Sequence, residues 1–215
     1  MNYSKEQIAA ALDLAVLKPT ATAADVRAAC ALAVARKIKS VCVAPVWVPM
    51  ASDLYSNICA VIAFPHGNTL SEAKYAEALA AMDCGAKELD VVVNYGQFLD
   101  SGKADSFWEI ASIVNAARPR GVLVKAILES ALYTPDQLHQ ACRLCVESGV
   151  DFVKTSTGFG PGGATPEAVK TMLEAVDGEA HVKASGGIKT YDDAARYLDL
   201  GCTRIGSSTY LGLLP

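Results

Sequence analysis

Eight short runs of apolar, strand-forming residues recur along the 215-residue chain, and segments with helical spacing separate most of them. Strands that alternate with helices pair in parallel, because each helix returns the chain to the same edge of the sheet. Eight such strands in one compact chain predict closure into a (β/α)8 TIM barrel of the α/β class. The expected strands cover residues 12–17, 40–44, 58–64, 88–93, 122–128, 151–155, 181–184 and 203–205.

The segments between these runs carry the signals that begin and end helices. Thr134 and Thr165 each place a capping hydroxyl before a proline at the first helical position. Gly149, Gly178 and Gly201 stand where helices should end. We therefore expect helices over residues 23–36, 70–84, 104–117, 134–147, 165–176 and 191–200.

The length fits one domain, because a single hydrophobic core can still grow in a chain of this size. No linker or low-complexity tract divides the sequence, so a single domain over residues 1–215 is predicted. The chain is shorter than the ~250 residues typical of such a barrel. Only residues 209–215 are left for a last helix. A doubly wound open sheet is the structural alternative.

Composition narrows the classes of function. The net charge of −4 and the pI near 5.4 argue against a nucleic-acid or anionic-membrane binder, since both need a basic face. The apolar runs are too short to span a bilayer, so no membrane association is expected. The seven cysteines are odd in number and scattered, which fits a reducing compartment, and we expect the cytoplasm.

Lysines are unusually frequent in the later strands. Lys125, Lys154 and Lys183 are equally spaced, one strand-helix unit apart, and should lie at similar levels on neighbouring strands. A single strand lysine usually snorkels to water. Two ammonium groups ~5 Å apart, however, repel by ~3 kcal/mol at an effective dielectric near 20, or roughly two pKa units. The repulsion favours a neutral amine able to attack a carbonyl, although the spacing does not say which lysine it is.

Glycine and serine follow the last two expected strands, where barrel enzymes often bind phosphate. The pair Gly186-Gly187 ends the seventh strand, and the run Gly206-Ser207-Ser208 ends the eighth. Glycine lets the backbone approach an anion, and serine hydroxyls and backbone N–H groups donate to it. Turns use glycine in any case, but two consecutive strands ending in this way favour a phosphate site.

Seven short stretches together carry a family resemblance. They are residues 12–14 (LDL), 41–43 (VCV), 61–67 (VIAFPHG), 88–90 (ELD), 152–159 (FVKTSTGF), 182–188 (VKASGGI) and 204–206 (RIG). In these motifs the chain resembles the deoxyribose-phosphate aldolases over nearly its whole length. The most specific motifs follow the sixth and seventh strands and occur in the family's order and spacing.

The resemblance implies a class I aldolase that reversibly cleaves 2-deoxy-D-ribose 5-phosphate to D-glyceraldehyde 3-phosphate and acetaldehyde, without a cofactor or a metal. It implies that Lys154 forms the Schiff base and that Lys183 is the neighbour that lowers its pKa. Asp90 is implied to relay protons, and Asp13 to orient the same polar network. The positions implied to contact phosphate are Gly158, Gly186, Gly187, Gly206 and Ser208. The partners implied are small sugar phosphates and aldehydes, with a homodimer as the assembly.

Three positions bear on rate and durability. Ala15 and Ala44 replace polar residues that the family usually has at the mouth of the barrel, so hydrogen bonds to sugar hydroxyls are expected to be missing. Cys42 shares a strand face with Ala44. If that face is the inner one, the thiol could add to an unsaturated aldehyde product and block the site. The alternative is that Cys42 is a small buried hydrophobe.

Two other functions stay open from the sequence: a Schiff-base aldolase for another sugar phosphate, and a phosphate-binding isomerase or synthase that forms no imine. A zinc site is not expected. Cys142 and Cys145 form a lone C-x-x-C pair on an expected helix, and the three histidines are dispersed.

Overall fold

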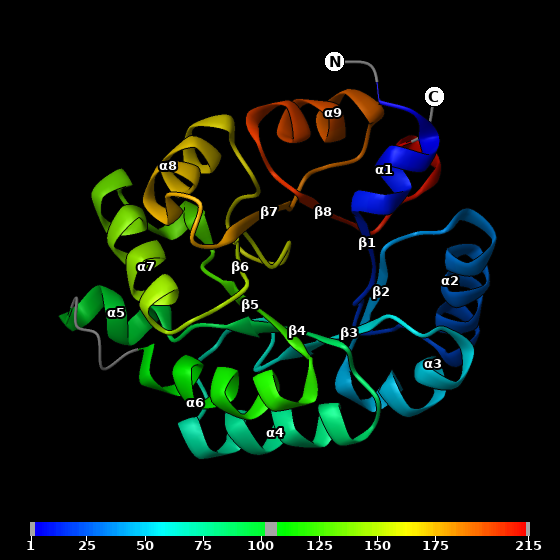
Figure 1. Cartoon of the computed structure of the whole chain (residues 1–215), viewed down its shortest axis with the longest axis horizontal. Coiled ribbons are helices and arrows are strands. Elements are labelled where there is room, and N and C mark those ends of the chain that lie inside the picture. The colour runs from blue at the N-terminus through cyan, green and yellow to red at the C-terminus, as the bar shows by residue number, and fades with distance from the viewer. Residues whose placement is uncertain (1–2, 102–106, 214–215) are drawn as a thin grey trace.

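In the computed structural model, which describes residues 3–101 and 107–213, eight parallel strands form a closed barrel in chain order. Figure 1 shows the helices as an outer ring around these strands. The predicted barrel is therefore confirmed, and the open-sheet alternative is wrong. The strands are β1 (Leu12–Val16), β2 (Ser40–Val43), β3 (Ile58–Ile62), β4 (Glu88–Val92), β5 (Leu123–Ile127), β6 (Phe152–Lys154), β7 (His181–Ser185) and β8 (Arg204–Ser207).

The helices of the ring begin at side-chain caps wherever the sequence offers them. Thr22, Thr134 and Thr190 each accept a hydrogen bond from the backbone N–H three residues on, and a side chain bonds back to complete a capping box. In the described residues no helix has the length and apolar character needed to cross a bilayer. The longer helices are α2 (Ala23–Arg36), α4 (Ser71–Asp83), α6 (Trp108–Ala117), α7 (Pro135–Glu147), α8 (Pro166–Val176) and α9 (Tyr191–Leu200).

Short elements depart from the predicted pattern. The unpredicted helices are α1 (Lys5–Ala11), α3 (Val48–Leu54) and α5 (Tyr95–Ser101), each of seven residues. Two turns of helix are marginal alone and depend on tertiary packing, which local patterns do not report. After β8, where a last helix was expected, the described chain forms only the 3-10 turn η5 (Leu211–Leu213). The first residues of the expected helix 104–117, up to 106, lie outside the described residues.

The barrel strands separate two chemically different faces. Outward side chains such as Val41, Leu89 and Val153 pack with the helices in one large apolar core. The inward side chains of several strands are charged instead, and they are almost fully buried. Because side chains alternate along a strand, the same short runs satisfy both faces. The barrel interior, called the chamber below, is thus filled by polar side chains and surrounded by the apolar core.

Candidate active site

Asp90 lies at the centre of the chamber, on the inner face of β4, with no exposed surface. The Lys125 ammonium donates to its Oδ1 at 2.9 Å. Lys154 and Lys183 donate to its Oδ2 at 2.6 Å and 2.8 Å. One carboxylate therefore accepts hydrogen bonds from three buried lysines that come from three consecutive strands.

The register of the strands places only two of these lysines side by side. Lys154 of β6 is the direct partner of Lys183 on β7. Lys125 of β5 is paired with Phe152, two residues before Lys154. Register partners are not level in a barrel, because its strands are tilted and staggered. All three ammonium groups nevertheless meet on the Asp90 carboxylate, as expected of lysines at similar levels.

Asp13 and Glu88 extend the network toward the amino ends of the strands. Asp13 on β1 accepts hydrogen bonds from Arg204 and from the Ser40 hydroxyl, each at 2.6 Å, and from Lys183. Glu88 pairs with Lys125 at 2.5 Å and with Arg204 at 2.8 Å. Both acids are almost fully buried, so these contacts replace hydration.

These contacts keep the acids ionised. Burial would raise the pKa of Asp90, but the ammonium groups of Lys125, Lys154 and Lys183 hold it well below its ordinary value. Burial likewise opposes ionisation of Asp13, yet Lys183, Lys125 and Arg204 lower the pKa of its carboxyl group. Burial acts to lower the pKa of Lys183, but Asp13 and Asp90 raise it above the ordinary value. Carboxylates thus lie between the lysines and offset the repulsion expected between bare ammonium groups.

The charges of the network do not balance. Three carboxylates, from Asp13, Glu88 and Asp90, face four basic side chains, from Lys125, Lys154, Lys183 and Arg204. An excess positive charge among buried groups is costly and favours the loss of one proton. Lys154 pairs with a single carboxylate, whereas Lys125 and Lys183 each pair with more. Its exposure of 4% is also the largest of the three. Lys154 is therefore the lysine of this network with the fewest carboxylate partners and the most exposed surface.

The loops after β6 and β7 lie against each other at the carboxyl end of the barrel. The Ala164 N–H donates to the Ser185 and Gly186 carbonyl oxygens at 3.0 and 3.1 Å. Gly158, Gly186 and Gly187 have φ of 85°, 87° and 80°, which favours glycine. The structure thus brings these expected phosphate-contacting positions to one end of the barrel, next to the end of β8.

The residues expected at the end of β8 differ in their surroundings. A Cβ added to Gly206 would lie 3.2 Å from Lys183 Cε and 2.9 Å from Ser185 Cβ, so this glycine gives Lys183 the room it occupies. The Ser207 hydroxyl donates its proton to the Ile188 carbonyl oxygen at 2.7 Å, so it cannot donate the same proton to a phosphate. Ser208 is exposed.

Cys42 lies on the inner face of β2. It is 1% exposed and packs with Cys59 and Val61 in a small cluster separate from the outer core. A hydrogen bond from Cys59 lowers the pKa of Cys42, and the nearby lysines act in the same direction. Ala15, its register partner on β1, packs against this cluster, and Ala44 follows the end of β2. The thiol therefore points into the chamber that holds Lys154.

Comparison with known proteins identifies the family. A sequence model of the DeoC/LacD family aldolases matches residues 7–208. The deoxyribose-phosphate aldolase of Carboxydothermus hydrogenoformans is 43% identical over 98% of this chain and 95% of its own length. That of Thermococcus kodakarensis is 42% identical over 96% of this chain and 95% of its own length. The chain belongs to the DeoC/LacD aldolase family.

Solved structures related to this aldolase share its barrel. A deoxyribose phosphate aldolase from Aeropyrum pernix, described as a unique tetramer, is 32% identical and covers 98% of this chain and 90% of its own, with a TM-score of 0.90. A putative deoxyribose-phosphate aldolase from Coccidioides immitis is 35% identical and covers 97% and 84%, with a TM-score of 0.91.

Several residues that support the site of this aldolase had no role predicted from the sequence. Glu129, which follows β5 with φ of 58°, accepts hydrogen bonds from Thr157 N–H at 3.1 Å and from the Thr157 hydroxyl at 2.5 Å, and so fixes the loop after β6. Glu88 and Arg204 are charged and lie on inward strand positions. Their spacing of two residues from Asp90 and Gly206 is a signal that could have found them, because alternate positions share a face.

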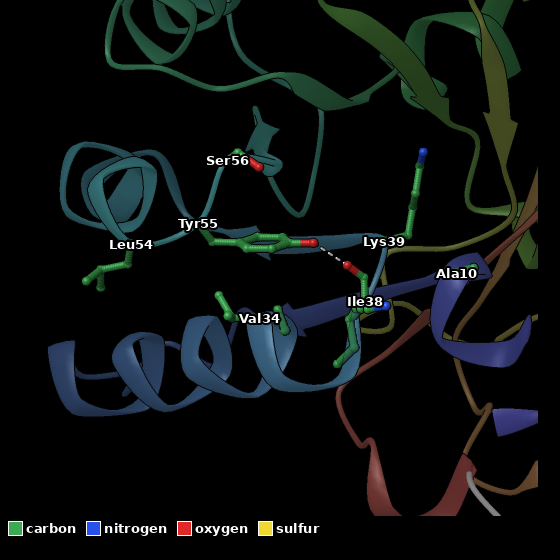
Figure 2. Close-up of a pocket in the computed structure, with 9 residues that line it drawn as sticks. Ala10, Val34, Ile38, Lys39, Leu54, Tyr55 and Ser56 are labelled. Atoms are coloured by element: carbon green, nitrogen blue, oxygen red, sulfur yellow. Dashed lines mark hydrogen bonds between the residues drawn. The ribbon is translucent and has the colours of Figure 1, made fainter. Parts of the chain in front are cut away.

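A surface pocket of this aldolase lies at the other end of the barrel. Figure 2 shows Tyr55 between Val34 and Ser56, with its hydroxyl donating to the Ile38 carbonyl oxygen. The lining residues Ile38 and Ser56 precede β2 and β3, so this pocket is at the amino ends of the strands. Active sites of (β/α)8 barrels lie at the carboxyl ends, where Lys154 is. The inner chamber, and not this pocket, is therefore the candidate active site.

Proposed function

We propose that this protein is a class I deoxyribose-phosphate aldolase that cleaves 2-deoxy-D-ribose 5-phosphate to D-glyceraldehyde 3-phosphate and acetaldehyde. Membership of the DeoC/LacD family supports an aldolase. The observation that carries the mechanism is a buried lysine, Lys154, which pairs with a single carboxylate of a network with excess positive charge. Such an amine is suited to attack an aldehyde.

Lys154 is the proposed nucleophile. Its amine adds to C1 of the open-chain sugar, and loss of water gives an iminium. Removal of the C3 hydroxyl proton sends the C2–C3 bonding electrons into the iminium, which releases glyceraldehyde 3-phosphate and leaves a two-carbon enamine. Protonation at C2 and addition of water then free acetaldehyde and the amine. The iminium keeps the positive charge beside Asp90, so the ion pair at 2.6 Å survives the change of covalent state.

Asp90 and Lys183 are proposed to move the protons. The Lys183 nitrogen lies 2.8 Å from Asp90 Oδ2, and the same oxygen contacts the Lys154 nitrogen. A water bound between Asp90 and Lys183 would therefore reach the reacting atoms. Asp13 is proposed to orient this pair, because it accepts hydrogen bonds from Lys183 on one oxygen and from Arg204 on the other. Lys183 remains charged in this scheme and acts as the acid.

Activity assays on matched sugar phosphates test the proposed function. Purified protein should release acetaldehyde and glyceraldehyde 3-phosphate from 2-deoxyribose 5-phosphate, both detectable by coupled reduction. Ribose 5-phosphate and fructose 1,6-bisphosphate serve as comparison substrates. Faster cleavage of either would assign the same chemistry to another sugar phosphate. Isomerisation without carbon–carbon cleavage would contradict an aldolase.

The phosphate is proposed to lie among Gly158, Gly186, Gly187, Gly206 and Ser208, at the end of the barrel where their loops meet. Ser208→Asp should raise KM for the phosphorylated sugar by at least tenfold, because it sets a negative charge against the dianion. Cleavage of plain 2-deoxyribose should change little. Ser208→Ala is the matched control for loss of the hydroxyl alone. Equal losses on both sugars would give Ser208 a structural role instead.

Cys42 is proposed to limit the life of the enzyme in concentrated acetaldehyde. Two acetaldehyde molecules can condense at Lys154 and lose water, and the resulting unsaturated iminium accepts a thiolate. Cys42→Met should leave the initial rate near normal and extend the half-life in acetaldehyde several-fold. The exposed Cys84 provides a matched control, since Cys84→Met should lose activity in acetaldehyde at the parent rate. A Cys42→Met variant inactivated as fast as the parent would show that Cys42 is only packing.

The cytoplasm is the proposed compartment, supported by seven cysteines that are all free. The proposed assembly is a homodimer; the relative from Aeropyrum pernix is described as a tetramer.

A further inference from the structure

Two thiols and a carboxylate meet inside the barrel below Lys154. The sulfur atoms of Cys42 and Cys59 and a carboxylate oxygen of Asp90 all lie within 4.8 Å of one another. Cys42 and Cys59 are register partners on β2 and β3, so their side chains leave the sheet on the same face. Cys59 donates its S–H to Asp90 Oδ1 at 3.1 Å. Each of the three residues is at most 1% exposed.

This set of atoms has the composition of a site for a thiophilic divalent cation. Zinc and the softer cadmium prefer thiolate ligands and accept a carboxylate beside them. With Zn–S near 2.3 Å and Zn–O near 2.1 Å, tetrahedral ligand atoms lie about 3.5–3.8 Å apart. The Cys59–Asp90 separation of 3.1 Å would have to lengthen, and any separation near the 4.8 Å limit would have to shorten by about 1 Å. A fourth position would be left for water.

The ion would enter beside Lys125, whose ammonium donates to Asp90 Oδ1 at 2.9 Å and to Cys59 Sγ at 3.4 Å, so Lys125 would have to give up these two contacts. Coordinating thiols lose their protons, so two protons leave as one divalent cation enters. The net charge of the network is then unchanged. The cation also takes the place of the Cys59 thiol proton, which now bridges Cys59 and Asp90.

Other cysteines in the described part of the chain do not gather a third ligand. Cys142 and Cys145 lie together on α7, within the outer apolar core. Cys84 is exposed at the end of α4. Within residues 3–101 and 107–213, Cys42, Cys59 and Asp90 form the only cluster of three potential ligands.

We propose that Cys42, Cys59 and Asp90 form an inhibitory binding site for a thiophilic divalent cation. Asp90 would become a ligand through Oδ1, which now accepts a hydrogen bond from Lys125. The cation would also draw negative charge from the carboxylate that Lys154 and Lys183 contact through Oδ2. The inhibitory effect rests on the proposed catalytic function of Asp90. Binding of the ion does not, so the two can be measured separately.

Cadmium titration of the chelator-treated whole chain tests the site. Thiolate ligation should produce an ultraviolet charge-transfer band that saturates at one cadmium per chain, with the bound metal counted after equilibrium dialysis. Turnover of 2-deoxyribose 5-phosphate should fall in parallel, and a chelator should restore it. Saturation of the band with full turnover would overturn the inhibitory assignment. A protein inactive on this sugar would contradict the proposed function but leave the absorbance test intact.

Single substitutions locate the ion. Cys42→Ser and Cys59→Ser should each weaken cadmium binding by at least tenfold and reduce the band per bound ion, because one thiolate is lost. Cys84→Ser is the matched control and should bind as the parent does. Circular dichroism verifies folding, and Cys42→Ala and Cys59→Ala are the second pair if a serine variant is unstable. Parent-like binding in the Cys42 and Cys59 variants, or loss of the band in Cys84→Ser alone, would overturn the proposal.

Discussion

Lys154→Ala is expected to slow cleavage of 2-deoxyribose 5-phosphate by about 10⁴-fold or more, because the covalent route disappears with the amine. The protein should nevertheless remain folded. Removing this lysine leaves three basic groups facing three carboxylates, so the buried network becomes balanced. Steady-state kinetics and thermal unfolding measure the two effects on the same sample.

Lys154→Arg is the matched control for charge, since it keeps a cation beside Asp90 but forms no imine under these conditions. It should be as inactive as Lys154→Ala. A Lys154→Ala variant that keeps a tenth of the parent turnover would contradict the assignment of the nucleophile. The same loss of turnover with an unfolded protein would be uninformative about chemistry, which is why the unfolding measurement is made first.

Asp90→Asn should lower both turnover and stability, whereas Lys154→Ala should lower turnover alone. Turnover should fall by roughly 10²–10⁴-fold, the usual contribution of general acid–base catalysis. Two carboxylates would then face four basic side chains, and breaking a buried ion pair costs about 3–5 kcal/mol. The free energy of unfolding should therefore drop, unlike that of Lys154→Ala. Single-turnover experiments should still detect imine formation at Lys154.

Asp83→Asn is the matched control, because its ion pair with Arg120 at 2.5 Å is at the surface. An exposed pair contributes about 0–1 kcal/mol, so neither stability nor turnover should change measurably. Full turnover in Asp90→Asn would remove Asp90 from the proton relay. Parent-like stability would show that water or a proton shift compensates for the lost carboxylate.

Strand order and the major helices could be predicted from the sequence because local chemistry specifies them. The expected helix 191–200 coincides with α9, where Thr190 caps the first turn and Gly201, with φ of 116°, ends the last. The helix α5 was not predicted, although Asn94 directly precedes it and accepts a hydrogen bond from the Gln97 N–H at 3.2 Å. Its Phe98 packs against Phe107 and Tyr133, contacts that exist only in the folded barrel.

The site was predictable in type but not in arrangement. Lysines on neighbouring strands indicate a buried cationic site, but register decides which of them are adjacent, and the stagger of a barrel is set by tertiary structure. Lys125 illustrates this point, since its register partner is Phe152 and it pairs with Glu88. The expected repulsion between the lysines also left out the carboxylates that lie between them and offset it. Family resemblance was confirmed, whereas the roles of the individual site residues stay predictions.

Reductive trapping tests the central claim most directly. Borohydride added with acetaldehyde reduces an imine to a stable secondary amine, so the enzyme should lose activity and gain one ethyl group. Peptide mapping should find that group on Lys154, and Lys154→Arg should remain unlabelled under the same conditions. A protein that stays active and unlabelled, or one labelled at Lys125 or Lys183 instead, would contradict a Schiff base at Lys154.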